Sequence, residues 1–150
     1  MKTNARKYIS LLLALCMVMS LLPAAALAAT TENNHGEHSG WKALSGSISS
    51  LSGNCYLTGN VTVSNEIQTS GDVTLCLNGH TLDLLGTTLF VDSGSFILCD
   101  CGSGKITGGK TGASAVQVNG GTFIMNGGTI TGNTGGGVQV ASTNSSASFI

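Results

Sequence analysis

Charged residues are scarce in this chain and unevenly distributed. They make up 9% of the 150 residues, so repulsion between like charges gives no reason to predict disorder. Three of the six Lys and Arg residues lie within the first seven positions, and beyond residue 29 only Lys42, Lys105 and Lys110 remain, against all seven acids, which gives −4. So few cations cannot neutralise a row of phosphates, and nucleic acid is therefore excluded as a partner.

Proline and aromatic residues are also rare, whereas glycine is abundant. The chain has one Pro, 5% aromatic residues and 22 Gly. This glycine content is about twice the usual ~7%, and it follows no Gly-X-Y period. It therefore predicts many tight turns.

Residues 1–29 have the pattern of a secretory signal peptide. Basic residues are followed by an apolar run over residues 9–22, and small residues then offer an Ala-x-Ala cleavage site at Ala26–Ala28. The alternative is a retained anchor, but the run is shorter than the ~20 residues that a membrane span needs. We expect export to a secreted or cell-surface location, with no membrane span after cleavage. Residues 30–40 read as a flexible polar lead-in.

Short β-rich segments separated by Gly, Asn and Ser turns repeat along the rest of the chain. Residues 70–75 (SGDVTL) align with 93–98 (SGSFIL) and 120–125 (GGTFIM), at offsets of 23 and 27. The Val-Gln-Val at residues 116–118 recurs at 138–140, an offset of 22. One unit therefore spans 22 to 27 residues and holds three short strands.

The period and the strand content together predict a fold class. Leucine-rich repeats would need a Leu-x-x-Leu-x-Leu frame, and propeller blades run longer, at about 40 residues or more. A coil of three strands, with each turn (a rung) ~4.8 Å above the last, fits both features. We therefore predict an all-β, right-handed parallel β-helix over residues 61–150, with a short N-terminal cap over 41–60.

Alternation along each strand predicts which side chains form the core. Residues that point inward should stack into columns on successive rungs, such as Val73, Phe96, Phe123 and Phe149. The first rung fits less well, since Glu66 and Gln68 fall where Leu89 and Val91 occur later, and residues 53–70 read as a transition. The predicted coil core is Val73, Leu75, Phe96, Leu98, Phe123, Met125, Val91, Val118, Val140, Ile106 and Ile130.

The two ends of the coil are interpreted differently. Leu44, Ile48 and Leu51 share the spacing of one helix face, which favours a short capping helix, although Gly46 weakens this pattern and a loop is the alternative. Residues 149–150 begin a strand of a new rung. We interpret the sequence as cut before the end of the protein.

Several of these segments resemble known proteins. Residues 56–63 (YLTGNVTV), 71–82 (GDVTLCLNGHTL), 98–101 (LCDC) and 104–108 (GKITG) resemble the opening of surface proteins of Gram-positive anaerobes. The resemblance implies a pectate-lyase-like parallel β-helix. Residues 123–130 (FIMNGGTI) are similar to the repeats of chlamydial polymorphic outer-membrane proteins, which implies a β-helical adhesin.

No set of residues predicts an active site. Asp72 aligns with Ser95 and Asp92 with Asn119, so no two acids share a column on adjacent rungs, and Asp100 falls in a turn. Neighbouring carboxylates, as a glycoside hydrolase needs, are therefore missing, and we interpret these acids as solvated turn residues.

Metal and cofactor sites are not predicted either. His35, Glu37 and His38 have suitable side chains for a metal, but they lie on no convincing helix, and structural zinc usually takes four ligands. We interpret this segment as a soluble spacer. No catalytic, cofactor-binding or metal-binding residue is predicted.

Four cysteines remain after the signal. Cys76 and Cys99 are 23 residues apart and should stack on neighbouring rungs, with Cα atoms ~4.8 Å apart, inside the range for a disulfide. Parallel stacked side chains leave the Cβ atoms slightly too far apart for an unstrained bridge. A Cys76–Cys99 disulfide and two free stacked thiols both stay open, and Cys101 aligns with Asn78 on the rung below.

Two functions are compatible with these observations. The first is a non-catalytic surface scaffold or adhesin that binds glycan or host protein along its outer faces. The alternative is the N-terminal part of a polysaccharide lyase or glycoside hydrolase whose active site lies beyond residue 150.

Overall fold

The computed structural model describes residues 37–141 and 146–150, all of which belong to one compact unit. The predicted signal peptide and residues 30–36 of the lead-in lie outside these described residues. The described residues contain no helix, and hence none that could cross a membrane. The strands are β1 (Lys42–Ile48), β2 (Gly53–Val63), β3 (Ile67–Thr69), β4 (Val73–Cys76), β5 (Thr81–Asp83), β6 (Leu89–Val91), β7 (Ser95–Cys99), β8 (Lys105–Thr107), β9 (Val116–Val118), β10 (Thr122–Met125), β11 (Thr129–Ile130), β12 (Val138–Val140) and β13 (Ser148–Phe149).

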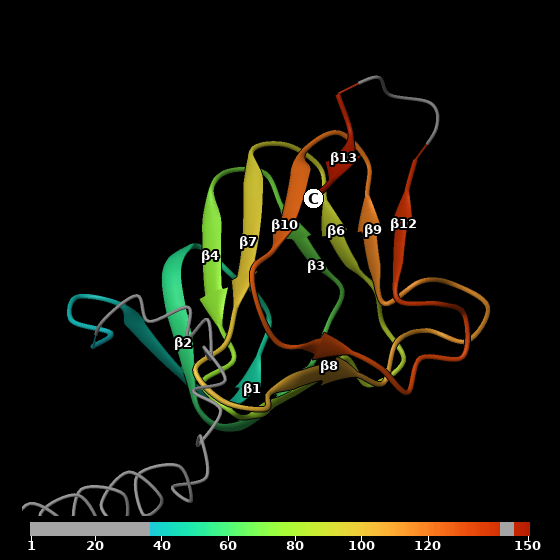
Figure 1. Ribbon diagram of the computed structural model, residues 1–150. Helices are drawn as coiled ribbons and strands as arrows, with labels where there is room; N and C mark the ends of the chain where they lie inside the picture. The colour runs from blue at the N-terminus through green and yellow to red at the C-terminus, as the bar shows by residue number, and fades with distance from the viewer. Residues whose placement is uncertain (1–36, 142–145) are drawn as a thin grey trace, which may run out of the picture. The chain divides into compact units, whose positions relative to one another are not determined.

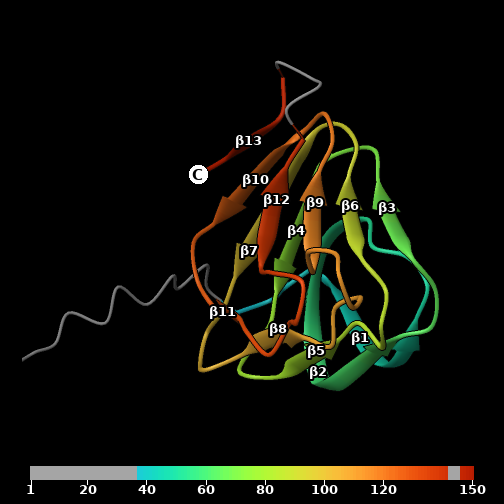
Figure 2. The ribbon, with the colours of Figure 1, turned by 90° about the vertical axis from the view of Figure 1, so that its right-hand side faces the viewer.

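The strands form three stacks in which every neighbour is parallel (Figures 1 and 2). The first stack runs β2–β4–β7–β10–β13, the second β2–β5–β8–β11 and the third β3–β6–β9–β12. From β2 onward, a strand pairs with the strand three places later in the chain, as in β4–β7–β10, and β2 pairs in addition with β1 and β4. Because β2 has 11 residues and pairs with both β4 and β5, the first two stacks join into one curled sheet.

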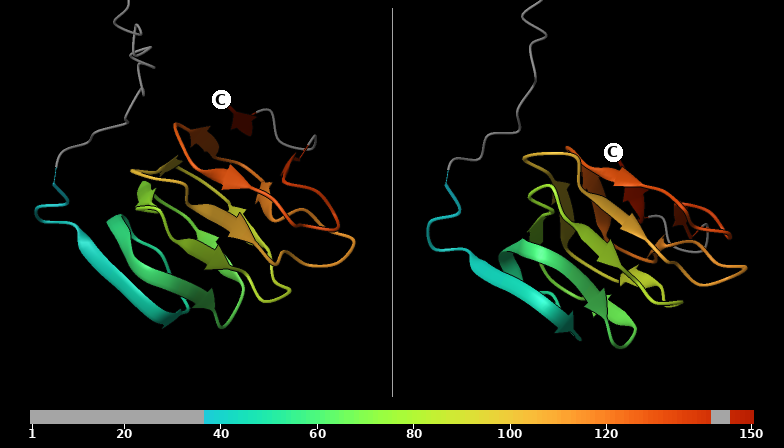
Figure 3. Two further views of the ribbon diagram at one scale, coloured as in Figure 1. Left: turned by 60° about the horizontal axis from the view of Figure 1, so that its bottom comes forward. Right: turned by 90° about the horizontal axis from the view of Figure 1, so that it is seen from below.

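The register of the stacks follows the sequence repeat. Val73 pairs with Phe96, which pairs with Phe123, and Phe123 pairs with Phe149. Val116 to Val118 pair with Val138 to Val140. The predicted all-β class is therefore confirmed, and so is the 22-to-27-residue spacing from β3 onward, whereas Gly53 of β2 pairs with Val73 at an offset of 20 and Val61 with Leu82 at 21. Figure 3 shows the resulting layers, from β1 and β2 in cyan and green to the last strands in red.

The core lies between the three stacks and consists of inward-pointing aliphatic and aromatic side chains. Its two largest fully buried side chains are Phe96 and Phe123, whose rings are tilted by 47° with centroids 5.6 Å apart. Of the predicted core residues, Met125 and Ile130 are partly buried against this core. Eight are buried: Val73, Leu75, Phe96, Leu98, Phe123, Val91, Val118 and Ile106.

Val140 departs from the prediction for the core, because 40% of its surface is exposed. It lies in β12, which among the described strands pairs only with β9. A side chain in a column needs a neighbour on both sides to be removed from water. The sequence pattern predicts that Val140 points inward, but it does not predict that β12 has a described neighbour on one side only.

The segment for which the sequence predicts a capping helix or a loop is a strand, so the prediction of a helix is wrong. β1 lies along β2, with Lys42 opposite Cys55 and Ile48 opposite Val63. The register shifts between Leu44 and Gly46. A single short helix is marginal in water, whereas pairing with β2 satisfies the backbone groups of this edge. The residues still cover the N-terminal end of the stacks.

The register of the first rung also differs from the prediction, by one residue. Ile67 and Thr69, rather than Glu66 and Gln68, pair with Leu89 and Val91. Ile67 and Thr69 are consequently buried, and Gln68 is exposed. A one-residue slip exchanges the two faces of a strand, so the apolar residue decides the register. β3 is therefore a full member of the third stack.

Candidate functional site

The turns that follow β4 and β7 meet around a buried carboxylate, Asp100. Only 7% of this residue is exposed. One carboxylate oxygen accepts a hydrogen bond from the Gly79 amide and the other from the Gly104 amide, each at 2.7 Å. Asp100 thus joins the turns of two rungs. The interpretation of Asp100 as a solvated turn residue is wrong, because both its oxygens replace water with backbone donors.

Two cysteines mark the ends of β4 and β7. Cys76 and Cys99 are opposite each other in the register, as predicted, and both are buried. None of the four described cysteines takes part in a disulfide, so of the two alternatives the structure has stacked thiols. The Cys99 thiol donates to the carbonyl oxygen of Leu75 at 3.5 Å.

The sulfur atom of Cys76 also lies beside that of Cys101. The two Sγ atoms are 3.6 Å apart. Alignment by strand offset places Cys101 beside Asn78 and therefore misses this contact. The turn held by Asp100 brings Cys101 over the end of β4, and the Cys99-Asp100-Cys101 spacing alone carries no signal for that path.

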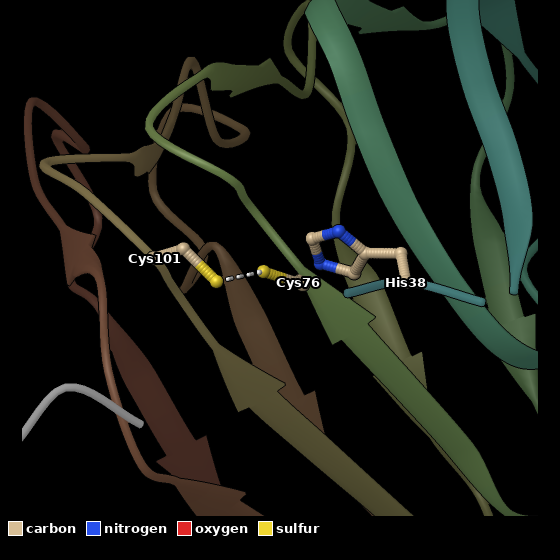
Figure 4. A group of neighbouring side chains, drawn as sticks. All are labelled: His38, Cys76 and Cys101. Atoms are coloured by element: carbon tan, nitrogen blue, oxygen red, sulfur yellow. Dashed lines mark hydrogen bonds between the residues drawn. The ribbon is translucent and has the colours of Figure 1, made fainter. Parts of the chain in front are cut away.

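His38, from the segment before β1, completes a cluster with these two cysteines (Figure 4). Its imidazole stacks on Tyr56 with a centroid distance of 4.2 Å and an angle of 6°, and Trp41 meets it edge-on. Tyr56 is the register partner of Cys76. An imidazole nitrogen and the sulfurs of Cys76 and Cys101 all lie within 4.8 Å of one another.

Burial governs the protonation of the cysteines. It raises the pKa of the Cys76 thiol well above its ordinary value, and the hydrogen bond with Cys101 raises it further. Burial likewise raises the pKa of Cys55 and of Cys99 to about 11 each. These three thiols are therefore protonated and poorly nucleophilic at neutral pH.

The sequence suggests His38 as a metal ligand only together with its chain neighbours His35 and Glu37. His35 lies outside the described residues, and Glu37 is exposed. The structure instead brings His38 together with cysteines that follow 38 and 63 residues later. Two thiols and an imidazole form a soft donor set, which suits zinc or copper(I) rather than calcium or magnesium.

The outward face of the third stack carries a ladder of planar polar groups and one aromatic ring. Gln68, Phe90, Gln117 and Gln139 follow one another in register along β3, β6, β9 and β12. The Gln117 amide donates to Asn119 at 2.9 Å. Phe90 and Gln117 are half-buried, and Gln68 and Gln139 are exposed. We refer to these four residues as the Gln/Phe ladder.

A concave feature lies along the edge formed by β1. An open, mainly polar depression of about 290 Å³ is lined by residues of β1 and of the turn that follows, from Lys42 to Ser50. Lys42 is its single ionisable side chain. It therefore offers no acid and base pair for catalysis.

Comparisons of the chain with family models, with curated proteins and with solved structures gave no match in any of the three. The function of this protein must therefore be inferred from its own residues.

Proposed function

We propose that this protein is an exported, non-catalytic surface scaffold with a right-handed parallel β-helix fold, and that it binds glycan along the Gln/Phe ladder. The three parallel stacks and the strand-to-strand offsets of 22 to 27 residues support this fold. Export rests on the signal-like pattern of residues 1–29. Cell-surface attachment and the likeness to pectate-lyase-like adhesins belong to the same proposal.

The Gln/Phe ladder is the observation that carries the glycan part of the proposal. Parallel stacking repeats its side chains at ~4.8 Å intervals along one face. Each Gln amide offers both donors and an acceptor, which suits an array of hydroxyl groups. The half-buried ring of Phe90 provides a flat apolar surface between Gln68 and Gln117. An extended polymer with regularly spaced hydroxyl groups fits such a face better than a compact ligand does.

The hydrogen bonds of the aspartates support a scaffold rather than an enzyme. Asp72 accepts from both the amide and the hydroxyl of Ser95, at 2.9 and 2.8 Å. Asp92 accepts from the side-chain amide of Asn119 at 2.7 Å. Asp100 holds two turns together. Each of these three carboxylates links neighbouring rungs, which is a structural use of its charge, and Asp83 accepts from the Leu85 amide in its own turn.

Glycan and host-protein arrays probed with the wild-type chain and with Phe90→Ala would test this proposal. We expect a glycan signal that falls roughly tenfold or more in the variant, because a central aromatic residue commonly dominates a binding face. The matched control is Ile97→Ala, since Ile97 is also half-buried and faces outward, but from the first stack. It should bind like the wild type.

Three outcomes would contradict the proposal. Flat profiles on both arrays would remove the adhesin function. A signal confined to host proteins would replace glycan as the partner. Equal losses in Phe90→Ala and Ile97→Ala, with both variants folded by circular dichroism, would remove the ladder as the binding face.

A further inference from the structure

We propose that His38, Cys76 and Cys101 bind a thiophilic divalent cation, Zn²⁺ foremost, with a fourth coordination position left to water or an external ligand. This inference is independent of glycan binding, because Cys76 belongs to the first stack, whereas the Gln/Phe ladder lies on the third. It rests on the spacing of the donor atoms, on their chemistry and on the contacts that hold them.

The spacing of the two sulfurs matches a shared cation. Two Zn–S bonds of ~2.3 Å at a tetrahedral angle place the sulfurs about 3.8 Å apart. The Sγ atoms of Cys76 and Cys101 are 3.6 Å apart, and an imidazole nitrogen of His38 lies within 4.8 Å of both. A disulfide would instead need the sulfurs at about 2.05 Å. The cluster is therefore already close to a metal geometry, whereas a bridge requires a further approach.

The donor set selects the class of cation. Thiolate and imidazole favour Zn²⁺ over the hard cations Ca²⁺ and Mg²⁺, which take oxygen ligands. Two cysteines and one histidine are also a known three-ligand set of zinc sites with an open fourth position. As each sulfur bonds the cation its proton passes to solvent, so one cation replaces two protons.

The surrounding residues hold all three ligands in place. Cys76 ends β4 and is fully buried. Asp100 anchors the turn that carries Cys101, through the amides of Gly79 and Gly104. The imidazole of His38 is stacked on Tyr56. Such supported side chains lose little freedom when a metal binds, which favours affinity.

The three ligands come from segments far apart in the chain. His38 precedes β1, Cys76 ends β4 and Cys101 follows β7. A bound cation would therefore link the segment before β1 to two rungs of the first stack. Since the three ligands come together only in the folded chain, Zn²⁺ should bind the folded state and raise the thermal stability of the protein.

Cobalt titration of the full 150-residue chain, reduced with a thiol-free reductant, would test the site. We expect one Co²⁺ per chain, with thiolate-to-cobalt charge-transfer absorption and the visible bands of tetrahedral cobalt, and displacement by Zn²⁺. Cys101→Ser should weaken Zn²⁺ binding by at least roughly 100-fold, since even supporting residues of metal sites cost 10–100-fold. His38→Ala should weaken it as well.

Cys55→Ser is the matched control, because Cys55 is buried but absent from the cluster. It should bind cobalt with the wild-type spectrum. Cys101 is exposed, so its substitution leaves the fold intact and the test does not depend on the buried Cys76. Absence of thiolate charge transfer, or unchanged binding by Cys101→Ser, would overturn the proposal. The proposal would also be overturned if the reduced chain did not bind Co²⁺ but formed a Cys76–Cys101 disulfide in air.

Discussion

Individual polar side chains connect one rung to the next. Hydroxyl groups of Thr69, Thr88 and Ser93 each donate to a backbone carbonyl of a neighbouring rung, at 2.9 to 3.2 Å. Asn78 does the same toward Leu57, at 3.0 Å. Every buried polar side-chain atom in the described residues has a partner. Such bonds add specificity to the register that the apolar columns set, since a slipped strand would lose them.

Asp72 shows how one such contact responds to pH. The hydrogen bonds from the Ser95 hydroxyl and amide hold the pKa of this carboxyl below its ordinary value. A lowered pKa means that the folded state favours the ionised form. The contribution of Asp72 to stability is therefore present above its unfolded pKa and is lost as pH falls through its folded pKa.

Ser95→Ala should raise the pKa of Asp72 toward the ordinary value, because it removes the hydroxyl donor. The measurement is a titration of the Asp72 side-chain carboxyl by NMR in both proteins. Urea unfolding of the same pair should show the variant losing less stability on acidification. An identical Asp72 pKa in the two proteins would contradict the prediction.

Among the elements, the turns before β4, β7 and β10 bring the backbones of successive rungs into close contact. Gly94 has φ +73°, and a Cβ placed there would lie 2.7 Å from the backbone carbon of Gly71 on the rung below. The backbones of successive turns therefore lie too close for a side chain. Glycine at this position serves both the turn and the stacking of rungs.

Gly94→Ala should consequently destabilise the protein more than Gly112→Ala. Both positions have positive φ, at +73° and +79°, but a Cβ at Gly112 meets nothing within 4 Å. The shared backbone strain cancels in the comparison, and the clash at Gly94 should cost a further ~1–3 kcal/mol. Urea unfolding of the two variants measures the difference. Equal losses would mean that the turns move apart at little cost.

The whole described unit is built by repetition of one layer. Strands in the middle of a stack, such as β6 and β7, have neighbours on both sides, whereas β12 and β13 pair on one side. Val140 in β12 and Phe149 in β13 are exposed. In stacked repeats each layer contacts only its neighbours, so local stability should decrease toward the ends.

Hydrogen exchange of the 150-residue chain should therefore show a gradient. Amides of β6 and β7 should exchange slowest, and those of β12 and β13 fastest, because the end strands can open without disturbing the rest. Mass spectrometry of peptides covering each strand provides the measurement. Uniform protection across all strands would indicate one all-or-none unit instead.

The sequence by itself determined the layered part of this protein. The offsets of 22 to 27 residues and the alternation of inward side chains predicted which strands pair and which residues, such as Phe96 and Phe123, stack. They could do so because parallel stacking places like residues on like residues, and a strand has only two faces. Regular repetition thus converts sequence spacing directly into contacts.

The tertiary structure alone decided whatever depends on irregular segments. β1 is a strand because the edge of β2 is available to it, and Ile67 decides the register of the first rung. The cluster of His38, Cys76 and Cys101 also depends on how a turn folds back and where the segment before β1 lies. No spacing in the sequence encodes these contacts, because turns have no period and their paths are set by partners such as Asp100.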